Sequence, residues 1–231
     1  MKIRRCVIVF WILSVGITLC GCTGMKNTLP PEMIDMSPFT GDPCSPPCWY
    51  GLRIAESNET EVVSTLKSLE FIDQESLKID STSIPDFDYF ISANLVTGKR
   101  ITTNCLEPRT LCLILNIANG KLRDIRSILN YEISFSEVIK SIGNPDKIGY
   151  TICCAESMAC EIQLIWIKKQ LVLTSETFAG IKGCDYSKKA LSTGMVDADL
   201  EIMEVDILPV EDINHLVDDS ELFGNFSGVN P

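Results

Sequence analysis

The order of apolar and polar positions predicts one helix followed by several strands in the first half of the folded region. Asn58 and Glu61 form a capping-box pattern, and the apolar residues after them recur on one helical face. A turn is expected at Thr97-Gly98, and Asn119-Gly120 is a strong signal for a tight β-hairpin. Apolar-rich stretches around these turns predict strands over residues 89–96, 99–105, 110–118 and 121–129.

The same order of patterns returns in the second half. Ser134 and Glu137 form a second capping box, 76 residues after the first, and Gly143 and Pro145 are typical of a helix end. Strands are predicted over residues 146–153, 161–167 and 171–178. The pattern predicts an α+β fold of two similar units, each with a helix packed on an antiparallel sheet. The alternative is one irregular α+β domain whose halves are alike by chance.

The first 21 residues have the features of a secretory signal. Three basic residues precede an apolar, uncharged run of 14 residues, which is shorter than the roughly 20 that span a membrane. The run ends in Leu19-Cys20-Gly21-Cys22, which resembles the bacterial lipobox that is cut before its last cysteine. We therefore expect lipidation at Cys22 and stable anchoring through acyl chains. A plain cleaved signal, an uncleaved anchor and Cys20 as the acceptor are the alternatives.

These signals divide the chain into segments with different expected roles. Four prolines and no periodicity indicate that the segment after the signal is a tether. In the acidic C-terminal segment, residues 200–208 could pair as a strand and 210–217 could form a short helix, whereas the last eight residues are expected to fray. The segments are a signal peptide (1–21), a tether (22–43), a first unit (44–130), a second unit (131–190) and an acidic, partly disordered segment (191–231).

The charge of the chain is strongly negative. Of 231 residues, 45% are hydrophobic and 22% charged, which is ordinary for a globular protein. Removing the signal takes away three of the 20 basic residues and none of the 31 acidic ones, so the net charge becomes −14. Ten of the acidic residues lie after Ala190, where no Lys or Arg occurs. This balance argues against nucleic-acid binding and against a basic patch for anionic lipid.

The cysteines indicate a disulfide framework. Eight cysteines follow Cys22, and an even number of cysteines in an oxidising compartment favours disulfides over free thiols. Cys44 and Cys48 flank a rigid Ser-Pro-Pro turn, and Cys105 and Cys112 flank a short connection, so each pair is expected to be bonded. The pairing of the others stays open, and their spacing fits neither a thioredoxin-like nor a zinc motif. The eight candidates after the signal are Cys44, Cys48, Cys105, Cys112, Cys153, Cys154, Cys160 and Cys184.

The stretch from Pro43 to Leu52 resembles a group of uncharacterised bacterial lipoproteins, mainly of Chloroflexi type. Their signature is Pro-Cys-x-Pro-Pro-Cys-Trp-x-Gly, and the resemblance extends weakly over most of residues 43–180. The order of a helix, Gly143-x-Pro145 and a hairpin is also similar to the lipoprotein fold of the outer-membrane assembly factor BamE. The first resemblance implies a lipid-anchored protein and the second a fold, and neither implies catalytic residues.

Few residues point to catalysis. The single histidine, His215, has Asp212, Asp218 and Asp219 near it in sequence, but no nucleophile motif accompanies it, so we interpret it as a surface residue. The acidic segment lacks a calcium-loop motif and is interpreted as a solvated face, with calcium binding left open. Trp49 and Tyr50 are interpreted as packing at the start of the domain, with an exposed binding rim as the alternative.

The sequence favours a lipid-anchored, non-catalytic protein on the outer face of the bacterial cell membrane, or of the outer membrane where one exists. It would act by binding or by structural support, without cofactor or metal. The second hypothesis is an envelope assembly factor that works with a partner protein, and the third is an extracytoplasmic enzyme. A pocket of converging ionisable groups would favour the enzyme, and an exposed apolar sheet face or edge would favour the assembly factor.

Overall fold

The computed structural model describes residues 29–30, 33–85, 95–107, 109–153, 159–175, 189–190, 193–218 and 223–230. The signal peptide and Cys22 lie outside them, as do Cys154 and Cys184. Within this part of the chain, no helix has the length and apolar character needed to cross a membrane.

Nine strands form one continuous antiparallel sheet in the order β12-β7-β8-β9-β11-β6-β5-β4-β3. The mixed α+β class with antiparallel pairing is therefore as expected. The strands are β3 (Lys78–Pro85), β4 (Leu95–Asn104), β5 (Leu111–Ala118), β6 (Lys121–Ile128), β7 (Lys147–Cys153), β8 (Ala159–Trp166), β9 (Leu171–Ser175), β11 (Ile202–Ile207) and β12 (Phe223–Asn225). Two small sheets pair β1 (Cys48–Trp49) with β2 (Leu52–Arg53) and β10 (Met195–Asp197) with β13 (Gly228–Asn230).

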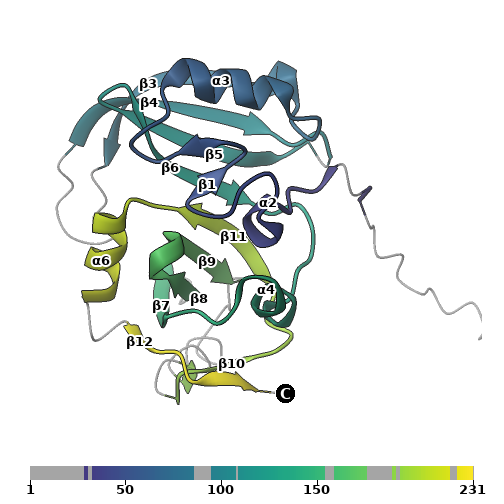
Figure 1. Ribbon diagram of the computed structural model, residues 1–231, viewed down its shortest axis with the longest axis vertical. Helices are drawn as coiled ribbons and strands as arrows, with labels where there is room; N and C mark the ends of the chain where they lie inside the picture. Colours follow the sequence, from purple (N-terminus) through teal and green to yellow (C-terminus); the bar gives the residue numbers. More distant parts are fainter. Residues whose placement is uncertain are drawn as a thin grey trace, which may run out of the picture.

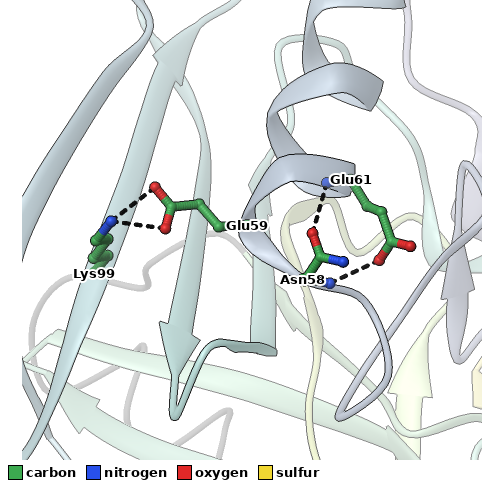
Figure 2. A network of polar contacts seen from close by, with 4 residues as sticks. All are labelled: Asn58, Glu59, Glu61 and Lys99. Carbon is green, nitrogen blue, oxygen red and sulfur yellow. Dashed lines mark hydrogen bonds and ion pairs between the residues drawn. The ribbon is translucent and has the colours of Figure 1, made fainter.

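Capping boxes start the two main helices, as the sequence predicts. In α3 (Glu59–Ser68), Asn58 Oδ1 accepts from the Glu61 backbone N–H at 3.1 Å, and the Asn58 N–H donates to the Glu61 carboxylate at 2.8 Å (Figure 2). In α4 (Phe135–Ile142), the Ser134 N–H donates to the Glu137 carboxylate at 2.9 Å. These contacts satisfy amide groups that the first helical turn leaves unpaired.

One face of the sheet carries the core and both of these helices. Directly opposed residues on five neighbouring strands form a buried apolar row of Ile101, Leu115, Ile125, Ile207 and Leu171. Leu66 of α3 and Phe135 of α4 belong to the same core cluster as this row. Lys99 of β4 also binds Glu59 of α3 at 2.7 Å (Figure 2), an exposed ion pair that contributes little to stability.

The opposite face of the sheet carries α6 (Val210–Asp218). Ile213 of this helix packs against Ile165 of β8 and Val172 of β9, which point away from the main core because side chains alternate along a strand. The short 3₁₀ helices η2 (Gln74–Ser76) and η3 (Ile167–Lys169) connect neighbouring elements.

β11 confirms that a strand forms within residues 200–208, and it shows that the interpretation of residues 191–231 as a partly disordered tail is wrong for this part. This strand lies between β9 and β6, at the centre of the sheet, and joins the strands of the two halves (Figure 1). Val205 and Ile207 enter the core, whereas Glu204 and Asp206 point to the other face. The expected boundary at residue 190 therefore does not separate a folded unit from a tail.

The last residues of the chain are also paired, where fraying was expected. β12 pairs with β7, and β13 pairs with β10 in parallel. Phe226 packs edge-on against Phe135 with ring centroids 5.8 Å apart, and Lys147 donates to Asn225 at 2.7 Å. Aromatic packing and backbone pairing together hold residues 223–230 on the fold.

The expected tether is shorter than predicted. Residues 33–43 contain the short helix α2 (Ser37–Thr40), whose Phe39 is buried, and α2 contacts α4. The hydroxyl of Ser141 in α4 donates to the Phe39 carbonyl. Burial of an aromatic ring explains why this proline-containing stretch is part of the fold.

The strands before the hairpin also differ from the prediction. Thr97-Gly98 is no turn, because Gly98 lies inside β4 and is paired with Thr82 on one side and Ala118 on the other. The prediction missed β3, and residues 89–94 lie outside the described part. The hairpin at Asn119-Gly120 is confirmed, with both residues at positive φ as a tight turn requires.

Candidate functional site

A cluster of polar side chains lies on the sheet face opposite α3 and α4. It consists of Asn116 of β5, Asp124 and Arg126 of β6, and Glu204 and Asp206 of β11, and we call it the polar cluster. Asn116 lies directly opposite Asp124, and Arg126 directly opposite Asp206. Residues opposed in this way share a face, so the antiparallel register brings the five side chains together.

Polar contacts run from β4 through β5 to β6, and others link β6 to β11. Arg100 Nε donates to Asn116 Oδ1 at 3.2 Å, and Asn116 Nδ2 donates to Asp124 Oδ1 at 2.7 Å. Arg126 Nε donates to Asp206 Oδ1 at 3.0 Å and lies 3.4 Å from Glu204 Oε1. One guanidinium therefore serves two carboxyl groups, a charge-assisted arrangement that is stronger than neutral hydrogen bonds.

Burial changes the protonation of these carboxyl groups. Loss of hydration raises the pKa of Asp124 to about 6, against the opposing effect of its hydrogen bond from Asn116. Burial and the neighbouring charge of Asp206 raise the pKa of Glu204 to about 8. Burial also raises the pKa of Asp206, and Arg126 opposes this rise. Glu204 and Asp206 are two neighbouring carboxyl groups beside Arg126, so they titrate as a pair.

Two buried oxygen atoms near this face lack a hydrogen-bond donor. They are Oδ2 of Asp124 and Oε1 of Gln163 in β8. Both side chains are 3% exposed, and an unsatisfied buried acceptor costs about 1–3 kcal/mol. The polar cluster can thus accept a further hydrogen bond and exchange a proton near neutral pH. Such groups occur in functional sites and in structural ion networks alike.

An ion pair fixes α6 beside the polar cluster. Arg123 Nη2 donates to Asp212 Oδ2 at 3.1 Å, and each side chain is 10% exposed. Asp212 is therefore buried and paired, as is Asp206, so a fully solvated acidic face is the wrong interpretation for these two residues. His215 lies exposed on α6, in agreement with its interpretation as a surface residue.

A separate buried contact holds the segment around Asp35 to Trp49 of β1. The Trp49 ring N–H donates to Asp35 Oδ2 at 2.8 Å, and the Ser37 hydroxyl donates to Asp35 Oδ1 at 2.7 Å. Burial raises the pKa of Asp35 despite these donors. Trp49 is buried, so it is no exposed binding rim, and it packs edge-on against Tyr50. Local sequence patterns did not identify Asp35, because it lies in the expected tether.

The structure contains both disulfides whose partners the sequence predicts. Cys44 is bonded to Cys48, with Cα atoms 5.7 Å apart, and Cys105 to Cys112, at 5.6 Å. Of the other candidates, Cys153 ends β7 and Cys160 lies in β8. Among the described residues, no three His, Cys, Asp or Glu side chains are grouped to hold a metal ion.

A pocket of about 520 Å³ lies at the end of α3, away from the polar cluster. Its walls come from the end of α3, from η2 and from the loop between β4 and β5, and none of the five residues of the polar cluster lines it. The charged side chains around it include Lys67, Asp73 and Arg109. The pocket and the polar cluster therefore lie at separate places in the fold.

No protein-family model, curated protein or solved structure matches this chain. The resemblance to bacterial lipoproteins through Pro43–Leu52 accordingly stays a prediction.

Proposed function

We propose that the protein is a lipid-anchored binding protein on the outer face of the bacterial cell membrane, or of the outer membrane where one exists. The two disulfides carry this proposal, because stable disulfides are typical of compartments outside the reducing cytosol. The signal-like start and the lipobox-like Leu19-Cys20-Gly21-Cys22 fit the same location. Chains that lose their signal and gain acyl groups at Cys22 would remain at the membrane surface.

Binding or structural support without catalysis is favoured by the pairing of ionisable side chains within the polar cluster. Arg126 contacts two carboxyl groups, and Arg100 donates to Asn116, which in turn donates to Asp124. Ionisable groups that pair with one another are typical of a structural network. An extracytoplasmic enzyme is the second candidate, favoured by the raised pKa values of Asp124 and Glu204.

We further propose that the fold is built from two similar α+β units that share one sheet. The residue before each helix N-cap accepts a hydrogen bond from the start of a later strand. The Leu122 N–H donates to the Ser57 carbonyl at 2.7 Å, and the Ile202 N–H donates to the Ile133 carbonyl at 3.0 Å. Each helix is followed by four strands of the large sheet, β3 to β6 after α3 and β7, β8, β9 and β11 after α4, with β10 of a small sheet between β9 and β11. The second unit then includes β11, and the β6–β11 pairing joins the units.

Labelling with a fatty-acid analogue in bacteria tests the location. The wild-type chain is expected to be labelled and membrane-bound, and Cys22→Ala is expected to abolish labelling. Cys20→Ala is the matched control, because it removes a neighbouring thiol and leaves the acceptor intact. Labelling that persists in Cys22→Ala, or disappears in Cys20→Ala, would assign the anchor to another residue.

Crosslinking in intact cells tests the mode of action. A binding protein is expected to give a discrete crosslinked species that survives the substitutions Asp124→Asn and Glu204→Gln. A turnover signal in a broad hydrolase and oxidoreductase screen that either substitution removes would instead establish the enzyme. Both experiments use the same two variants, so one set of proteins distinguishes the binding protein from the enzyme.

A further inference from the structure

The outermost strand β3 presents a long, open sheet edge. Among the described strands it has a single neighbour, β4. All eight residues of β3 pair with β4, and no described strand pairs with the other side of β3. Residues 78–81 are all exposed, and Ile79 is 43% exposed. The other edge of the sheet ends in β12, a strand of three residues. Short edge strands are protected from further pairing, and long ones are not.

The side chains of β3 continue the two faces of the sheet. Ile79 lies directly opposite Ile101, which is fully buried, so Ile79 extends the apolar layer beneath α3 to the edge. Lys78 and Asp80 point to the other face, where Asp80 is opposite Arg100. The edge thus carries one apolar residue flanked by a cation and an anion.

We propose that β3 pairs in antiparallel fashion with β3 of a second copy of this chain, with Ile79 on the two-fold axis. This register places Ile79 opposite Ile79 and Lys78 opposite Asp80 of the second copy, twice by symmetry. Directly opposed apolar and oppositely charged pairs stabilise antiparallel strands. A two-fold interface requires a self-complementary patch, and the Lys78-Ile79-Asp80 order is self-complementary in this register.

The alternative register that overlaps all eight residues is less suitable. It would place Lys78 opposite Pro85, which has no backbone N–H to donate. It would also leave Lys78 and Asp80 without an oppositely charged residue of the second copy opposite them. The chain already uses the same kind of join internally, because β6 and β11 connect its two halves by antiparallel pairing. The proposal rests on membrane anchoring, since confinement of the copies to one surface raises their effective concentration.

Cysteine crosslinking of the full-length protein in bacterial membranes tests this register. In the proposed pairing, the two side chains at position 79 have Cβ atoms about 4.5–5.5 Å apart. Ile79→Cys is therefore expected to give a disulfide-linked dimer under mild oxidation. Ser81→Cys is the matched control, because it is equally exposed on the same face but lies opposite residue 77, and it is expected to stay monomeric. A monomeric Ile79→Cys protein, or equal crosslinking of both variants, would overturn the proposal.

Charge reversal distinguishes a second copy from a different partner. In the Ile79→Cys background, Lys78→Asp or Asp80→Lys is expected to lower the dimer fraction roughly tenfold, because each creates two like-charge contacts. The double exchange restores both opposite-charge contacts and is expected to restore the dimer. Failure of that rescue would refute pairing between copies. Fatty-acid labelling of the same samples reports the anchor independently, so loss of the dimer and loss of anchoring are separate readouts.

Discussion

Replacement of Asp124 by asparagine tests the energetic description of the polar cluster. The substitution keeps the shape of the side chain and an oxygen that can accept from Asn116, but removes the buried charge. Burial raises the pKa of Asp124 from 3.8 to about 6, which corresponds to about 3 kcal/mol at about 1.4 kcal/mol per pKa unit. Asp124→Asn is therefore expected to stabilise the folded protein by up to about 3 kcal/mol where Asp124 is ionised.

The sign of the pH dependence follows from the direction of this pKa change. The folded state holds the proton of Asp124 more tightly than the unfolded state does. The stability that this residue contributes is present below pH 4 and is lost as the pH rises through about 6. The gain from Asp124→Asn is consequently small at pH 4 and reaches its full size near pH 8.

Urea unfolding of both proteins at pH 4, 6 and 8 measures this difference. Asp199→Asn is a suitable control, because Asp199 is an exposed carboxylate of the same segment as Asp206. Its free energy of unfolding is expected to follow the wild type within about 0.5 kcal/mol at each pH, as for most surface substitutions. An Asp124→Asn protein that is equally or less stable than the wild type at pH 8 would refute the assignment of a costly buried charge.

Three further variants test other parts of the fold. Replacing Cys105 and Cys112 together by serine is expected to lower the free energy of unfolding by about 2–3 kcal/mol in urea, and an unchanged midpoint would contradict a stabilising bridge. Trp49→Phe removes the ring N–H from a buried carboxylate and is expected to cost about 1–3 kcal/mol, which thermal unfolding measures. Gly149→Ala introduces a Cβ that collides with the ring of Phe223, so faster hydrogen exchange is expected in β12 alone; unchanged exchange would argue against this packing.

The parts of the fold that local patterns determine could be predicted from the sequence. Each capping box needs residues three apart, and the hairpin needs Asn119-Gly120, so neither depends on distant contacts. The two disulfides of short sequence separation were predictable for the same reason. β3 was missed because its sequence is largely polar, and a sheet-edge strand with exposed residues lacks the apolar alternation that identifies inner strands.

The polar cluster was out of reach of sequence analysis because its members come from strands that are distant in the chain. Arg126 lies 80 residues before Asp206, the residue directly opposite it across the sheet. Nothing local marks these acids among the 31 of the chain. Their pairing depends on the order of strands in the sheet, which in turn depends on where β11 inserts.

β11 shows why charge content alone is a poor guide to order. The region after Ala190 holds ten acidic residues and no Lys or Arg, and that composition favours a solvated tail. The order of residues in Ile202–Ile207 indicates otherwise, because Glu204 and Asp206 alternate with Val205 and Ile207. Alternation places both acids on one face of a strand, where Arg126 of β6 meets them, and both apolar residues in the core. The period of the pattern, more than the number of charges, therefore decides whether an acidic segment is solvated or forms the centre of a sheet.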